Sequence, residues 1–178
     1  MTRTVLLVID AQELLMNNNL YEFDLFSANV KKLISEARNS GVEIIYIRHD
    51  DGKGKPLSKA NDGYDIYYDF APEKGKLVFD KTVNSPFKES GLLEHLREIC
   101  AGKLIVTGLQ TDYCIDATVK CGFEYGFEII VPKYCNTTYD NEYMTAEATY
   151  SYYNDFIWND RYAKSVSLAE AIDLIRSR

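Results

Sequence analysis

The chain has 178 residues, of which 46% are hydrophobic and 26% charged, and its formal net charge is −7. This length suits one compact domain, and the composition is that of a globular protein, not of a disordered or fibrous one. We therefore expect a single domain over residues 1–178. The negative charge argues against a nucleic-acid partner, because phosphate binding depends on a surplus of Lys and Arg gathered on one face.

Membrane insertion and secretion are also disfavoured. The longest apolar segments, such as residues 5–9, are far shorter than the roughly 20 residues that cross a bilayer, and the Met-Thr-Arg start has no apolar signal region. The four cysteines have no CxxC spacing, and the chain is long enough to fold without disulfides. We expect reduced thiols in a cytoplasmic protein.

Short apolar segments alternate with longer amphipathic ones along the chain. In chain order they predict a strand over 4–9, a helix over 25–39, strands over 42–48 and 76–79, a helix over 91–99, a strand over 103–107, a helix over 112–122, a strand over 128–131, a helix over 144–153, a strand over 163–166 and a helix over 168–175. Continuously apolar strands that alternate with helices are typical of a parallel sheet covered on both faces. We predict an α/β fold, a three-layer αβα domain with a doubly wound, mostly parallel sheet.

Local signals support these boundaries. Glycines at 41 and 122 are expected to end helices, and Ser167 with Glu170 forms a capping-box pattern that opens the last helix. Residues 50–72 have no periodic pattern and are rich in Gly, Asp, Pro, Lys and Tyr. We expect an irregular surface loop there, close to a site.

The predicted strand ends carry the chemically interesting side chains. Asp10 follows the first strand, His49 the second and Lys81 the third, and residues 108–114 follow the fourth and end in Cys114. In an open parallel sheet, ligands bind at the carboxyl ends of the strands. A carboxylate, an ammonium and a thiol are therefore expected to meet at one edge of the sheet.

Together these groups can activate a nucleophile. A nearby cation and a helix N-terminus both lower the pKa of a thiol, and with Thr111 as N-cap, Cys114 would lie in the first helical turn. Lys81 would supply the cation, and Asp10 would take the thiol proton. Each side chain alone also fits a turn residue, a solvated charge or a core cysteine. Their joint placement favours a site.

Three segments resemble the signature segments of isochorismatase-like cysteine hydrolases. They are Val-Ile-Asp-Ala-Gln at 8–12, Lys81 followed by Ser-Pro-Phe at 85–87, and Gly-Leu-Gln-Thr-Asp-Tyr-Cys-Ile at 108–115. Their order and spacing match over essentially the whole chain. The superfamily includes nicotinamidases, N-carbamoylsarcosine amidases, and biuret, ureidoacrylate and streptothricin hydrolases. The resemblance implies the isochorismatase-like hydrolase fold, with Asp10, Lys81 and Cys114 as catalytic residues.

The resemblance implies further details. The bond between Leu109 and Gln110 would be a cis peptide, and the backbone amides of Gln110 and Cys114 would form the oxyanion hole. Gln12 and Phe87 fall where relatives line the substrate pocket, although a local cap and a core aromatic are equally open readings. The resemblance also implies a homo-oligomer, a dimer or tetramer.

A metal site is not expected. Nicotinamidases hold a divalent ion with an Asp-x-His pair after the second strand and a further histidine in the next loop. Here that region reads His49-Asp50-Asp51, and the chain's other histidine, His95, lies in a predicted helix. Two histidines and a carboxylate cannot be assembled from this set. We predict no metal and no other cofactor, with His49 either a polar strand-end residue or a substrate contact.

The function predicted is a cysteine hydrolase that cleaves an amide or related C–N bond of a small molecule through a Cys114 thioester. Relatives without a cysteine at this position cleave a vinyl ether instead. The alternative is a noncatalytic small-molecule-binding protein, or a thiol redox sensor, on the same fold. A dinucleotide site is disfavoured because residues 10–15 contain no glycine.

Overall fold

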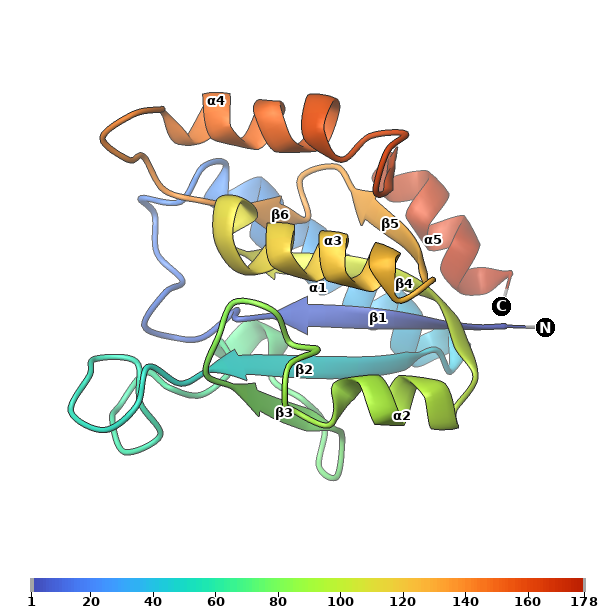
Figure 1. Ribbon diagram of the computed structural model, residues 1–178, viewed down its shortest axis with the longest axis horizontal. Helices are drawn as coiled ribbons and strands as arrows, with labels where there is room; N and C mark the ends of the chain where they lie inside the picture. Colours follow the sequence, from blue (N-terminus) through green and yellow to red (C-terminus); the bar gives the residue numbers. More distant parts are fainter. Residues whose placement is uncertain (1, 178) are drawn as a thin grey trace.

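The structure is a computed structural model, and it describes residues 2–177 (Figure 1). The strands are β1 (Arg3–Ile9), β2 (Glu43–His49), β3 (Val78–Lys81), β4 (Ala101–Leu109), β5 (Glu128–Pro132), β6 (Asn136–Thr137) and β7 (Lys164–Val166). The helices are α1 (Phe23–Ser40), α2 (Leu92–Glu98), α3 (Asp116–Glu124), α4 (Ala146–Ser151) and α5 (Leu168–Arg176). Three single turns complete them: η1 (Tyr68–Phe70), η2 (Thr111–Ile115) and η3 (Tyr152–Ile157).

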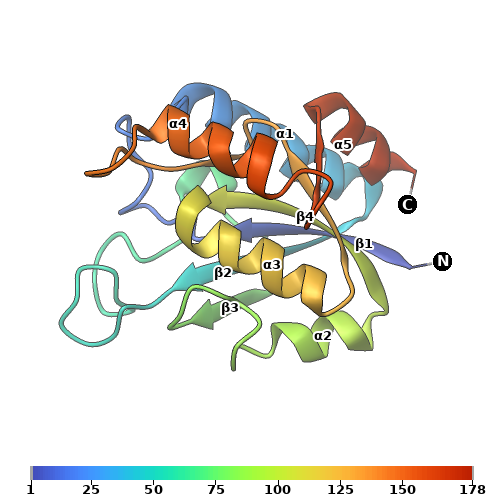
Figure 2. The same cartoon turned by 45° about the horizontal axis from the view of Figure 1, so that its top comes forward.

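The strands form one parallel sheet with the order β3-β2-β1-β4-β5-β7, and β6 pairs with the end of β4. Helices α1 and α5 cover one face, and α2 and α3 cover the other (Figures 1 and 2). Successive residues of β1 alternate between the two cores, with Leu6 and Val8 packing toward α1 and Leu7 and Ile9 toward α2 and α3. The predicted three-layer, doubly wound fold is confirmed.

The strand order reverses at β1. The chain runs outward through β2 and β3 on one side of β1, and β4 then returns to the other side. At such a switch point the connections leave in opposite directions and open a crevice beyond the strand ends. Asp10 follows β1 at this crevice, and residues 108–114 lead out of β4 beside it.

Several boundaries differ from the sequence predictions. The third strand is shifted to Val78–Lys81, so Lys81 belongs to it. Helix α3 continues past Gly122 to Glu124, because Gly122 packs in helical conformation against Ile129. The helix predicted over 144–153 begins at Ala146 and widens into η3, and β6 is too short to give a pattern. The caps at Gly41 and Ser167 are confirmed.

The loop over 50–72 is irregular as predicted, except for η1 and an isolated antiparallel bridge between Gln12 and Ile66. That bridge holds the returning part of the loop against the chain that leaves β1. Across residues 2–177, the helices all fall short of the length and apolar character needed to cross a bilayer.

Gly108 sets how closely β4 approaches β1, and its replacement tests this constraint. Its φ is +120°, and a Cβ built there would overlap the carbonyl oxygen of Ile9. We expect Gly108→Ala to lower the free energy of unfolding by more than about 3 kcal/mol, because strain and overlap add. Gly126→Ala is the control, since its φ of +87° is also left-handed but its surroundings are open. Urea denaturation should show a loss of only about 1–2 kcal/mol there, and equal losses at both positions would contradict this account.

Candidate active site

The register of β2 and β3 orders the side chains at the edge of the sheet. His49 lies opposite Lys81, and Arg48 lies opposite Asp80. Directly opposite residues point to the same face of a sheet, and successive residues to opposite faces. Lys81 and His49 therefore share the face that turns toward Cys114, whereas Arg48 and Asp80 project from the other.

The Lys81 ammonium joins the predicted catalytic residues. Its Nζ lies 2.7 Å from Oδ2 of Asp10 and 3.2 Å from Sγ of Cys114. Nδ1 of His49 lies 2.9 Å from the same Nζ. The side chains of Lys81 and Asp10 are 0% and 3% exposed, so the ion pair is removed from solvent. The structure thus brings together the carboxylate, the ammonium and the thiol, as the sequence predicted.

The sequence predicted a lowered pKa for the Cys114 thiol, and the structure indicates the opposite direction. Burial and the neighbouring Asp10 carboxylate together raise the pKa of the Cys114 thiol to about 12, and Lys81 offsets only part of their effect. Burial also raises the pKa of the Asp10 carboxyl, against the opposing effect of Lys81. Both pKa shifts favour the protonated forms, so a nucleophilic role for Cys114 would require a nearby proton acceptor, and Asp10 is the carboxyl group at hand.

The segment that carries Cys114 leaves β4 through a cis peptide bond between Leu109 and Gln110 and then forms the wide turn η2. Thr111 was expected to cap the helix, but no side chain caps this turn. The Thr111 hydroxyl instead donates to Oδ1 of Asn136 at 2.8 Å. Asn136 and Asn154 exchange two amide hydrogen bonds, of 2.8 and 3.1 Å.

Asn136 and Asn154 are both 1% exposed, and neither is among the site residues predicted from the sequence. A buried amide must satisfy its donors and acceptor inside the protein, so this pair fixes Thr111 and the start of the turn. Asn136 lies in the two-residue strand β6 and Asn154 in the turn η3, and no local sequence pattern shows that two such residues are partners.

A cavity of about 280 Å³ opens beside Cys114. Gln110 and Cys114, the expected sources of the oxyanion-hole amides, both line it. Asn84 overhangs the nucleophile, with Oδ1 3.8 Å from Sγ. Apolar walls come from Leu15, Leu57, Leu109 and Tyr113, and polar ones from Asp10, His49, Asp51 and Asn84.

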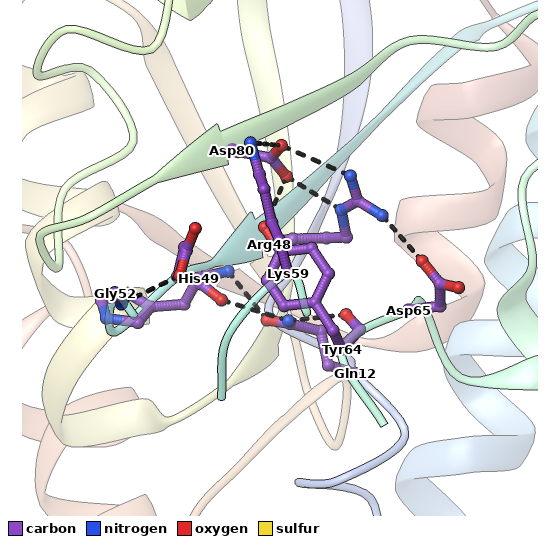
Figure 3. A network of polar contacts seen from close by, with 9 residues as sticks. Gln12, Arg48, His49, Gly52, Lys59, Tyr64, Asp65 and Asp80 are labelled. Carbon is purple, nitrogen blue, oxygen red and sulfur yellow. Dashed lines mark hydrogen bonds and ion pairs between the residues drawn. The ribbon is translucent and has the colours of Figure 1, made fainter. Parts of the chain in front are cut away.

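The Gln12 side chain is held by hydrogen bonds inside the protein. It is fully buried, and its amide is occupied by main-chain groups (Figure 3). Oε1 accepts from His49 N–H at 2.8 Å, and Nε2 donates to the carbonyls of His49 and Tyr64 at 3.2 and 2.8 Å. The Gln12 amide therefore joins the end of β2 to the loop and is not a local cap, and its contact with substrate stays a prediction.

Phe87 also lies away from the cavity lining. Its ring packs in the core beneath α3, stacked on Phe127 with centroids 6.1 Å apart and close to Tyr125 at 5.5 Å. With 7% of its surface exposed and its ring packed on two aromatics, Phe87 has the surroundings of a core aromatic, the second of its two readings, and its contact with substrate stays a prediction.

The loop is anchored on the opposite face as well. Asp80 accepts from Arg48 at 2.9 Å, from Tyr64 at 2.9 Å and from Lys59 at 2.7 Å (Figure 3). These contacts hold the pKa of the Asp80 carboxyl below its usual range, although its partial burial opposes this. Tyr64 and Lys59 belong to the 50–72 loop, so this carboxylate fixes the segment that carries Leu57 into the cavity.

Asp10, His49 and Cys114 offer ligand atoms that all lie within 4.8 Å of one another. Their donor types would suit a transition metal. The Lys81 ammonium, however, lies 2.7–3.2 Å from all three and already takes the place of a cation. The metal ligands of a nicotinamidase do not fit either. The second histidine of the chain, His95, lies on α2, where its Nε2 is 2.7 Å from Oε1 of Glu43 on β2. A resident metal does not fit this site while Lys81 is charged.

The comparisons with known proteins agree with this geometry. The model of the isochorismatase domain matches residues 4–156. The chain belongs to the isochorismatase family. Its members include the isochorismatase family protein YddQ of Bacillus subtilis, which is 30% identical over 141 residues, covering 76% of this chain and 78% of YddQ.

Two further similar proteins are described as an amidohydrolase and an isochorismatase. The ureidoacrylate amidohydrolase RutB of Serratia proteamaculans is 25% identical over 158 residues, covering 67% of this chain and 64% of that protein. The crystal structure of an isochorismatase from Pseudomonas putida superposes with a TM-score of 0.88 at 25% identity, covering 94% of this chain and 89% of that one. This isochorismatase-family hydrolase therefore shares its fold with a solved isochorismatase and is similar in sequence to an amidohydrolase.

The buried ion pair predicts an unusual stability pattern. Asp10→Asn leaves the buried Lys81 ammonium without a counter-charge and should cost about 3–5 kcal/mol. Adding Lys81→Met removes that charge at similar volume, so the double variant should be more stable than Asp10→Asn alone. Urea denaturation measures both, and activity should be absent in both. Losses that simply add would contradict the pairing.

Proposed function

We propose that this family member hydrolyses an amide or related C–N bond of a small molecule through a thioester on Cys114. The observation that carries the proposal is the single ammonium of Lys81, within hydrogen-bond distance of both Asp10 and Cys114 beside the cavity. A nucleophile, a base and a fixed positive charge at one point are what acyl transfer requires.

In the proposed cycle, Sγ of Cys114 attacks the substrate carbonyl carbon while its proton passes to Asp10. The oxyanion that forms is stabilised by the backbone amides of Gln110 and Cys114. The C–N bond then breaks as Asp10 returns the proton to the leaving nitrogen, which releases an amine and leaves a thioester. Water then attacks the thioester carbonyl while Asp10 takes one of its protons. The C–S bond breaks, Asp10 returns that proton to Sγ, and the carboxylic acid leaves with the Cys114 thiol restored.

The raised pKa of Asp10 supports this assignment. A carboxylate that is more basic than usual accepts a thiol proton more readily and, once protonated, is an acid matched to the leaving nitrogen. Lys81 keeps a positive charge beside Sγ and thereby stabilises the thiolate that develops during attack. The amidohydrolase activity in the name of the relative RutB is consistent with the same bond class.

The same features disfavour a redox sensor. Sensor cysteines are exposed and have low pKa values, because the thiolate is the form that oxidants attack. Cys114 is 8% exposed, and its thiol pKa is raised. Acid-quenched mass spectrometry separates the two functions. An acyl adduct on Cys114 after mixing with an amide substrate supports the hydrolase, and reversible sulfenic acid with no acyl adduct supports the sensor.

The cavity constrains the substrate. Its volume of about 280 Å³ suits a small molecule, and its walls combine apolar side chains with the amide of Asn84 beside the nucleophile. We propose a compact acyl group with at least one hydrogen-bonding substituent next to the scissile bond, such as a ureido or carbamoyl group. A panel of ureido, carbamoyl, lactam and aromatic amides tests this directly.

Single cysteine replacements test the nucleophile. With any substrate from that panel, Cys114→Ala should lower kcat/KM by at least about 10³-fold, because the covalent route is lost. Cys121→Ala is the matched control, since Cys121 lies in α3, about two helical turns after Cys114. Cys100→Ala and Cys135→Ala are further controls. These three should stay within about threefold of the native rate. Equal losses at Cys114 and Cys121, or survival of activity without Cys114, would overturn the assignment.

A further inference from the structure

We propose that His49 is a positioning residue of the nucleophile, which supplies the third acceptor of the Lys81 ammonium in one fixed tautomer. This inference rests on the proposed function, since it concerns the activation of Cys114. His49 ends β2 and lines the cavity, as a polar strand-end residue or a substrate contact would, and the contacts of its ring point to a further role.

An ammonium carries three N–H donors and no acceptor. The side chain of Lys81 is 0% exposed, so water cannot serve these donors and each needs an acceptor within the protein. Asp10 accepts one at 2.7 Å, and Sγ of Cys114 lies in the direction of another at 3.2 Å. Nδ1 of His49, at 2.9 Å, is the third partner.

The tautomer of His49 follows from this contact. Because the ammonium can only donate, Nδ1 must carry a lone pair, and the ring hydrogen is on Nε2. Nε2 lies 3.0 Å from Oδ1 of Asp51, which can accept that hydrogen. The imidazole is therefore neutral, with Lys81 on one side and Asp51 on the other.

The main chain of His49 is fixed as well. The Gln12 amide contacts both its N–H and its carbonyl (Figure 3), and the register of β2 and β3 places it directly opposite Lys81. With ring and backbone both held, the ammonium cannot rotate freely. Its remaining donor is directed at Sγ of Cys114, where a thiolate must form.

A neutral acceptor suits this position better than a charged one. A carboxylate would satisfy Lys81 equally well but would add a negative charge near the thiol, whose pKa Asp10 already raises. A protonated imidazole would instead oppose the ammonium and lose the acceptor. The charged and titratable groups that face His49 are Lys81, Asp51, Asp10 and Cys114.

The test compares His49→Asn, His49→Asp and His49→Leu in the full chain. Asn and Asp place an oxygen where Nδ1 lies, one neutral and one charged, whereas Leu offers no acceptor. The readout is the rate of Cys114 alkylation by iodoacetamide against pH, followed by peptide mapping because Cys100 is exposed. Alkylation needs no substrate, so it tests His49 even if no amide in the panel is hydrolysed.

We expect His49→Asn to stay within about threefold of the native alkylation rate at neutral pH. His49→Asp and His49→Leu should each be slower by about tenfold or more, which corresponds to a rise of one unit in the apparent thiol pKa. Thermal unfolding checks the fold, and the isosteric Asn and Asp variants decide the matter if His49→Leu does not fold. Equal rates for Asn and Asp, or a native pH profile in His49→Leu, would overturn the proposal.

Discussion

The site depends on a buried ammonium that must be fully paired. Removing a lysine side chain from water costs several kcal/mol, and this cost is offset only when opposite charge and acceptors surround the ammonium. Strand β3 places Lys81 at the edge of the sheet with its side chain fully buried. Oδ2 of Asp10, Nδ1 of His49 and Sγ of Cys114 surround its ammonium. The positions of these three residues, and of the elements that carry them, follow from that requirement.

The fold meets the requirement through the close approach of β1 and β4. Asp10 turns away from β1 in a left-handed conformation, with φ of 51°, and Gly108 lets the end of β4 pass directly beside Ile9. The turn that follows brings Cys114 back over the strand ends, and Asn136 holds its start through Thr111. The proposed nucleophile and its proposed base thus follow neighbouring strands, and the ammonium comes from the edge strand β3.

Much of this could be predicted from the sequence because it depends on periodicity. Apolar strands alternating with helices imply a parallel sheet, and the carboxyl ends of parallel strands meet at one edge, so the convergence of Asp10, Lys81 and Cys114 follows from their places at strand ends. The register of His49 with Lys81 could not be derived, since it depends on where β3 begins, and the prediction placed that strand two residues too early.

Other features depend on burial and on distant partners, which the sequence does not display. The thiol pKa was expected to be lowered by a cation and a helix terminus, but desolvation has the larger effect and raises it. Gln12 reaches across to His49 and Tyr64, and Asn136 pairs with Asn154, through contacts that no local pattern predicts. Phe87 has a neighbouring motif that suggests a pocket, yet its ring is enclosed by core aromatics.

The central claim is that Cys114 is a protonated thiol at rest and gives its proton to Asp10 beside Lys81 only during the reaction. The ultraviolet absorbance of the thiolate tests it most directly, as a pH titration of the native chain minus that of Cys114→Ser. We predict that the Cys114 thiolate absorbance is absent across the neutral range and appears only in strong alkali. A full thiolate signal at neutral pH that is lost in Cys114→Ser would contradict it, because the nucleophile would then be ionised before any substrate binds.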